Sequence, residues 1–80
     1  MVYKEGMKVV LTVGCELHAT HSYEGVSEEE KEDYTEILHE NLGMTFEVSE
    51  DQYEEGYPVW VTSEDKSVEI LVDDFGLKLL

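Results

Sequence analysis

The chain has 80 residues, with 20 Asp and Glu, 5 Lys and no Arg, which gives a formal net charge of −15 and a pI near 4.2. This length predicts a single domain over residues 1–80, and the charge argues against direct binding to nucleic acid or to an anionic membrane, because both would repel it. Leu, Ile, Val and Phe number 22, which predicts a folded core in spite of the charge.

The redox and membrane signals of the sequence point to the cytoplasm. Cys15 is the only cysteine, so no disulfide can form within the chain. No apolar run reaches the roughly 20 residues that a membrane-spanning helix needs. We therefore expect a cytoplasmic protein.

The first predicted element is a strand from Met7 to Leu17, because apolar residues recur at every second position. Its expected buried face consists of Met7, Val9, Leu11, Val13, Cys15 and Leu17. The segment "HATHSYEGV" that follows contains turn-forming residues without a helical period, so we predict a loop there.

An amphipathic helix is predicted over residues 28–42. Ser27 and Glu30 form a capping box before it, and Gly43 supplies a stop after it. Its expected packing face consists of Tyr34, Ile37, Leu38 and Leu42. Its opposite face is acidic and consists of Glu28, Glu29, Glu32, Asp33, Glu36 and Glu40.

Three further strands are predicted at residues 44–48, 58–62 and 68–72, and the "SEDK" turn joins the last two in a hairpin. The apolar end "LKLL" fits an edge strand, a packed tail or an interface. The element order β-α-β-β-β predicts an α+β fold, in which a small antiparallel sheet carries the acidic helix on one face.

The acidic residues are clustered in the sequence. Residues 24–55 contain 13 acidic residues and one Lys (1 − 13 = −12), whereas the rest of the chain has seven acidic residues and four Lys (4 − 7 = −3). Charge that only kept the protein soluble would be spread more evenly, so the clustering favours a binding surface. The predicted partner-binding residues are Glu28, Glu29, Glu32, Asp33, Glu36, Glu40, Glu50, Asp51, Tyr53, Glu54 and Glu55.

Chemical sites are weakly supported by the sequence. Cys15, His18 and His21 in "CELHATH" are residue types that zinc accepts, but a structural zinc site needs four ligands. The segment from Asp51 has a glycine in the sixth place, as a calcium loop does, but it has Thr62 where that loop needs a carboxylate. No catalytic motif is present, and we predict a protein without enzymatic activity, cofactor or metal.

Carboxylates about one helical turn apart, at Glu29, Asp33, Glu36 and Glu40, would form a row of negative charge like that of a nucleic-acid backbone. In "SEEEKEDYTEILHE", in "SEDQYEEGY", in its small size and in its lack of Arg, the chain resembles the acidic DNA-mimic inhibitors that bacteriophages make. The resemblance implies a partner-binding protein in the host cytoplasm that covers the DNA-binding surface of a host protein and excludes DNA by competition. The histone-like nucleoid protein HU is the first choice of target.

Two other functions stay open at this point. One is an acidic interaction module that binds a basic cellular partner, and the other is a metal-dependent regulator that uses Cys15, His18 and His21.

The apolar end "FGLKLL" also predicts a homodimer, because twofold pairing is the commonest way for a small protein to bury such a patch.

Overall fold

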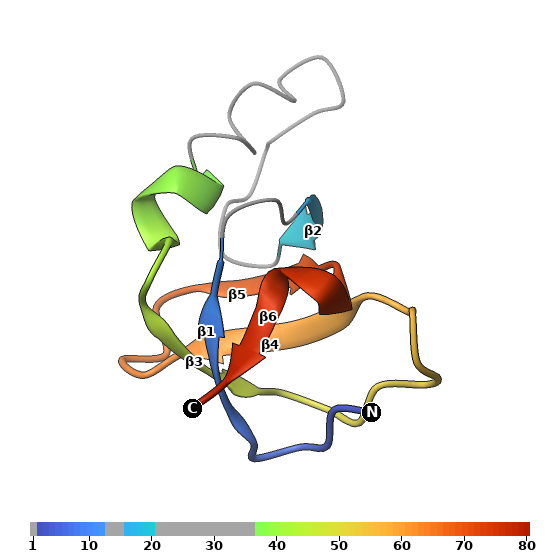
Figure 1. The fold of residues 1–80 in the computed structure, drawn as a ribbon. Helices are drawn as coiled ribbons and strands as arrows, with labels where there is room; N and C mark the ends of the chain where they lie inside the picture. The colour runs from blue at the N-terminus through green and yellow to red at the C-terminus, as the bar shows by residue number, and fades with distance from the viewer. Residues whose placement is uncertain (1, 13–15, 21–36) are drawn as a thin grey trace.

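A computed structural model describes residues 2–12, 16–20 and 37–80, and most of this structure is one six-stranded antiparallel sheet (Figure 1). The strands are β1 (Lys8–Leu11), β2 (Leu17–Thr20), β3 (Thr45–Val48), β4 (Val59–Ser63), β5 (Glu69–Val72) and β6 (Leu77–Leu79). A 3-10 turn, η2 (Asp74–Gly76), precedes β6. The strand order is β2-β5-β4-β3-β1-β6, so β2 and β6 are the two edges of the sheet.

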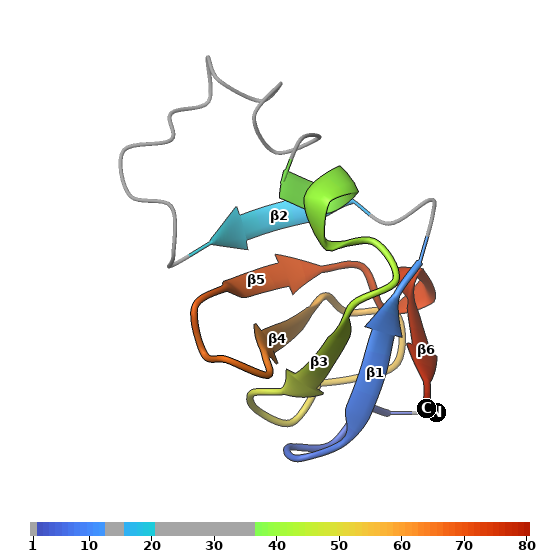
Figure 2. The same cartoon turned by 90° about the vertical axis from the view of Figure 1, so that its left-hand side faces the viewer.

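The sheet curves strongly around its own buried face. In both views β1 and β6 run at a large angle to β2 and β5 (Figures 1 and 2). Burial alternates along β4, because successive side chains point to opposite faces of the sheet. Val59 and Val61 are buried on the inner face, and Trp60 between them is only partly buried. Burying a side chain of this kind contributes roughly 1.5–3 kcal/mol relative to its exposed state.

Among the residues that the structure describes, the strands supply almost the whole core. Ten of the twelve buried apolar residues in this part of the chain belong to strands, and the other two are Tyr3 and Ile37. The strand residues of the core are Val9, Leu11, Leu17, Phe46, Val48, Val59, Val61, Ile70, Val72 and Leu77.

The α+β prediction is therefore wrong. The fold is mainly antiparallel sheet, and among the described residues only 37–41 are α-helical. An α+β arrangement needs a helix that covers one face of the sheet. Among the described residues, the core consists mainly of side chains from the strands of the curved sheet itself. Ile37 enters the core, and Leu38 and Leu42 are partly buried against it.

The predicted acidic face of the helix falls largely outside this structure. Residues 28–36 lie outside the described residues, and so does Tyr34 of the expected packing face. Of the predicted carboxylate row, Glu40 is in the described helical segment 37–41, whereas Glu29, Asp33 and Glu36 lie outside the described residues. The stop at Gly43 is confirmed, because this residue has a φ of 78° and lies two positions after the last helical residue, Asn41.

The single strand predicted from Met7 to Leu17 is also wrong. β1 ends at Leu11 and β2 begins at Leu17, and residues 13–15, with Val13 and Cys15, lie outside the described residues. β1 pairs with β3 and β6, whereas β2 pairs with β5 at the far edge. Apolar residues alternate in the same way in β1 and β2. The alternation therefore could not show that the chain breaks between them and that the second strand pairs with a different neighbour.

The predicted hairpin is confirmed, and of the three alternatives for the C-terminal end the structure shows the edge strand. β4 and β5 pair on either side of the turn, with the register Thr62↔Glu69. Within the turn Asp65 accepts hydrogen bonds from the hydroxyls of Ser67 (2.6 Å) and Ser63 (2.7 Å). The end "LKLL" contributes β6, which pairs only with β1 among the described strands.

Candidate functional site

The predicted partner-binding residues divide into three groups in the structure. Glu28, Glu29, Glu32, Asp33 and Glu36 lie outside the described residues. Glu40 is exposed on the helical segment 37–41. The other five, Glu50, Asp51, Tyr53, Glu54 and Glu55, are exposed on the connection between β3 and β4. We call residues 49–58 the acidic loop, and in both views it lies apart from the helical segment (Figures 1 and 2).

One buried glutamine holds the acidic loop against the N-terminal segment. Gln52 is only 4% exposed, and its backbone N–H donates to the carbonyl of Tyr3 at 2.8 Å. Its side-chain Oε1 accepts from the Tyr3 N–H at 3.0 Å, and its Nε2 donates to the Tyr57 carbonyl at 2.6 Å. With the bond to Asp74 described below, all polar atoms of its amide are satisfied, and this one side chain joins Tyr57 of the loop to the N-terminal segment.

Asp74 fixes the other side of the acidic loop. Its Oδ2 accepts from the Gly56 N–H at 2.8 Å and from Gln52 Nε2 at 3.1 Å. Gly56 adopts a φ of 94°, which a residue with a Cβ rarely adopts. The loop is consequently joined to η2 as well as to the N-terminal segment, so its exposed side chains stand on a constrained backbone.

Two tyrosines project from this backbone. Tyr53 is 82% exposed and Tyr57 is 48% exposed, and their ring centroids are 5.1 Å apart with the planes tilted by 44°. Exposed aromatic rings of this kind are enriched at protein interfaces, because they combine a large apolar area with a hydroxyl that can form a hydrogen bond.

The carboxylates of the acidic loop differ in their partners. Asp51 accepts from the Glu5 N–H at 2.9 Å and lies 3.9 Å from Lys4 Nζ, with both side chains 61% exposed. Within the described ranges, Glu50 and Glu54 have no cationic partner. Their charges are therefore available to a binding partner.

Glu47 on β3, unlike Glu50 and Glu54, has two lysine partners within the chain. Lys8 Nζ donates to its Oε1 at 2.9 Å, and Lys66 Nζ lies 3.7 Å from its Oε2. The hydrogen bond and charge of Lys8, with the charge of Lys66, lower the pKa of the Glu47 carboxyl. The charge of this carboxylate is already balanced by two lysines of the chain, so it is less available to a binding partner than the charges of Glu50 and Glu54.

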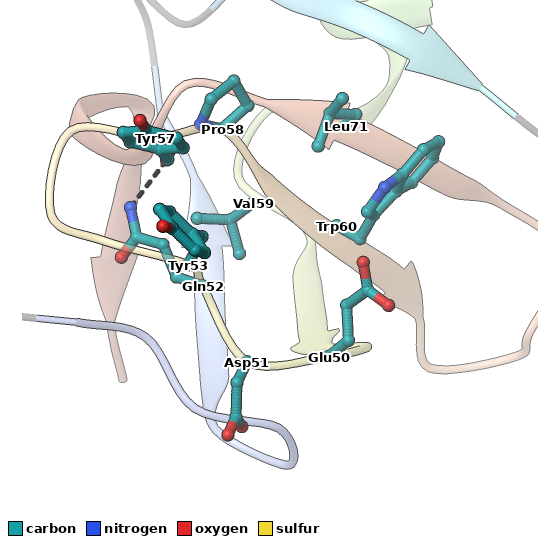
Figure 3. Close-up of a pocket in the computed structure, with 9 residues that line it drawn as sticks. All are labelled: Glu50, Asp51, Gln52, Tyr53, Tyr57, Pro58, Val59, Trp60 and Leu71. Carbon is teal, nitrogen blue, oxygen red and sulfur yellow. Dashed lines mark hydrogen bonds between the residues drawn. The ribbon is translucent and has the colours of Figure 1, made fainter.

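Beside the tyrosines the surface is hollowed, with a volume of about 210 Å³ (Figure 3). The lining residues are Glu50, Asp51, Gln52, Tyr53, Tyr57, Pro58, Val59, Trp60 and Leu71. In Figure 3 the Glu50 carboxylate points toward the side chain of Trp60, whereas the Asp51 carboxylate points away from it. The volume is below the roughly 300–1,000 Å³ of pockets that enclose small molecules or cofactors.

Sequence reasoning missed part of this hollow. Trp60 and Leu71 are directly opposite each other on β4 and β5, so they form one wall of it. Their pairing depends on the strand register, which the sequence did not specify. A usable signal was present for Tyr57 and Trp60, because both lie within a few residues of the acidic cluster.

Of the possible zinc ligands Cys15, His18 and His21, the structure describes His18. Cys15 and His21 lie outside the described residues, and His18 on β2 meets Asp73 instead, with His18 Nε2 2.5 Å from Asp73 Oδ1. Atoms of Glu16, His18 and Asp73 that can bind a metal lie within 4.8 Å of one another. One imidazole and two carboxylates suit divalent transition metals, but the contact of His18 with Asp73 is a hydrogen bond that needs no metal.

Within the described residues, no helix has the length and apolar character needed to cross a membrane. Comparisons with models of protein families, with curated proteins and with solved structures found no match to this chain.

Proposed function

We propose that this chain is a non-catalytic binding protein, whose acidic loop docks on a basic surface of another protein in the cytoplasm. The observation that carries the proposal is the constrained loop itself, which carries exposed carboxylates together with the exposed ring pair of Tyr53 and Tyr57.

The physical chemistry of the loop suits this role. A net charge of −15 attracts a basic partner over a distance and raises the rate of encounter. After contact, the tyrosines supply the apolar area that charge alone lacks. Because Gln52 and Asp74 hold the backbone in advance, little conformational entropy is lost when the partner binds.

Two variants with equal charge test the proposal. The loop variant carries Gln in place of Glu50, Glu54 and Glu55, and the control variant carries Gln in place of Glu5, Glu16 and Glu64. All six side chains are exposed, so neither variant removes a core contact. Each variant loses three negative charges, and any difference between them reports position and not total charge.

Binding to purified HU, the first-choice partner, is measured by titration calorimetry at low and at physiological salt. The loop variant should bind much more weakly than the control, and the affinity of the unaltered protein should fall as salt rises, since exposed charges are screened over about 8 Å at physiological ionic strength. Capture from a bacterial lysate on the two variants extends the test to other basic proteins. If both variants retain every partner that the unaltered protein binds, the acidic loop is not the docking surface.

DNA mimicry is a second candidate and a narrower form of the same function. The observation that favours it is the net charge of −12 between residues 24 and 55, which would compete with phosphates for Lys and Arg side chains. The assay is displacement of a labelled DNA duplex from HU. Displacement by the unaltered protein and by the control variant, but not by the loop variant, supports mimicry. If HU binds the protein and DNA at the same time, the protein is an acidic interaction module and not a DNA mimic.

A further inference from the structure

We propose that the hollow between the tyrosine pair and Trp60 is a binding site for one arginine side chain of the basic partner. This inference rests on the proposed function, and it specifies which chemical group the protein recognises and where.

The shape of the hollow matches one long side chain. Its lining includes Pro58 from the acidic loop and Leu71 from β5, whereas Val59, which borders it from below, is 1% exposed and belongs to the core. Pro58 and Leu71 offer apolar surface to a methylene stem, and arginine and lysine commonly bury their stems along such surface while the charge stays near water. The volume of about 210 Å³ leaves little room for a larger ligand.

The polar features of the hollow match a cation at the end of that stem. Trp60 lines the hollow, and tryptophan is the side chain that attracts a cation most strongly through its ring face. The Glu50 carboxylate points toward Trp60 in Figure 3 and has no cationic partner among the described residues. A positive group at this point would therefore meet an aromatic ring and an unpaired carboxylate together.

Arginine satisfies this pair better than lysine does. Its planar guanidinium can stack on a ring while its N–H groups donate to a carboxylate, whereas the ammonium of lysine is a compact charge that stacks poorly. The strand pairing Trp60↔Leu71 and the bonds of Gln52 hold the two sides of the hollow in place. The site is consequently formed before the partner arrives.

The chain contains a built-in reporter for the test, since Trp60 is its only tryptophan. The probe is a short synthetic peptide with lysine at both ends and one central arginine flanked by glycine and serine. A second peptide has citrulline at the centre, which keeps the shape of arginine without its charge. Binding is measured by calorimetry, and occupation of the hollow by the fluorescence of Trp60.

The protein variants are Glu50→Gln and the matched control Glu64→Gln, which removes an equal charge from the turn between β4 and β5. We expect the arginine peptide to change the Trp60 emission and Glu50→Gln to weaken its binding by about tenfold, as for the loss of a charge-assisted hydrogen bond. Glu64→Gln should weaken it by less than about twofold, as for an exposed charge. The citrulline peptide should leave the Trp60 emission unchanged.

The outcomes separate this inference from the proposed function. Equal binding of the arginine peptide to both variants, or equal effects of the arginine and citrulline peptides, would overturn the arginine site while leaving the acidic loop as a docking surface. Failure of the loop variant to lose HU or any captured partner would instead overturn the proposed function. A Trp60 response to the arginine peptide that Glu50→Gln abolishes supports the inference.

Discussion

Replacing Gln52 by Ala should destabilise the protein far more than its polar character suggests. The side chain is 4% exposed and makes three hydrogen bonds, to the Tyr3 N–H, the Tyr57 carbonyl and the Asp74 carboxylate. Two neutral bonds at roughly 0.5–1.5 kcal/mol each and one charged bond at roughly 1.5–3 kcal/mol predict a loss of about 2.5–6 kcal/mol in the free energy of unfolding. Small domains are stable by only about 5–15 kcal/mol, so the variant should approach the limit of folding.

Urea denaturation followed by Trp60 fluorescence measures this loss, and Asp51→Asn on the neighbouring exposed residue is the control. The control should change stability by no more than about 1 kcal/mol, because Asn retains an Oδ1 that can accept from the Glu5 N–H and the lost ion pair with Lys4 is exposed and long. The midpoint of Gln52→Ala should fall at an unchanged slope. A loss below about 1 kcal/mol would refute the argument that Gln52 ties the acidic loop to the N-terminal segment.

The remaining predictions concern the β4–β5 turn and the C-terminal end. Hydrogen bonds from Ser67 and Ser63 lower the pKa of Asp65 to about 2, and Ser67→Ala should raise it toward the ordinary value, as NMR titration of the carboxyl carbon would show. Because the folded pKa is the lower one, the contribution of Asp65 to stability is present above about pH 4 and is lost as the pH falls toward 2. An Asp65 that titrates normally would contradict this. We also expect a homodimer, since Phe75 and Leu80 are 70% and 72% exposed beside the edge strand β6, and sedimentation that shows only monomer at micromolar concentration would exclude it.

Local chemistry was enough to predict several elements. The hairpin around Asp65 follows from turn residues between two alternating runs, and the stop at Gly43 follows from the need for a positive φ after a helix. The exposure of Glu50 and Tyr53 also follows from a local cluster of charge, which cannot be buried without partners. Their binding role stays a prediction.

The hollow could not be predicted in the same way. Trp60 and Leu71 meet because β4 and β5 pair in one register, and a shift of one residue would turn Trp60 into the core. Gln52 is an ordinary polar residue in the sequence, and its importance appears only when Tyr3 and Asp74 are brought to it from distant parts of the chain.

By itself the sequence determined the charge of this protein, the alternation of its strands, the β4–β5 turn and the acidic loop with its tyrosines. Only the tertiary structure decided that the sheet curves over its own core, that Leu17–Thr20 forms a strand on the far edge, and that a hollow with Glu50 and Trp60 opens beside the loop. The physical reason is the range of the forces involved. Alternation, turns and charge act between neighbours along the chain, whereas strand partners and the direction of curvature depend on how the whole sheet buries its apolar face.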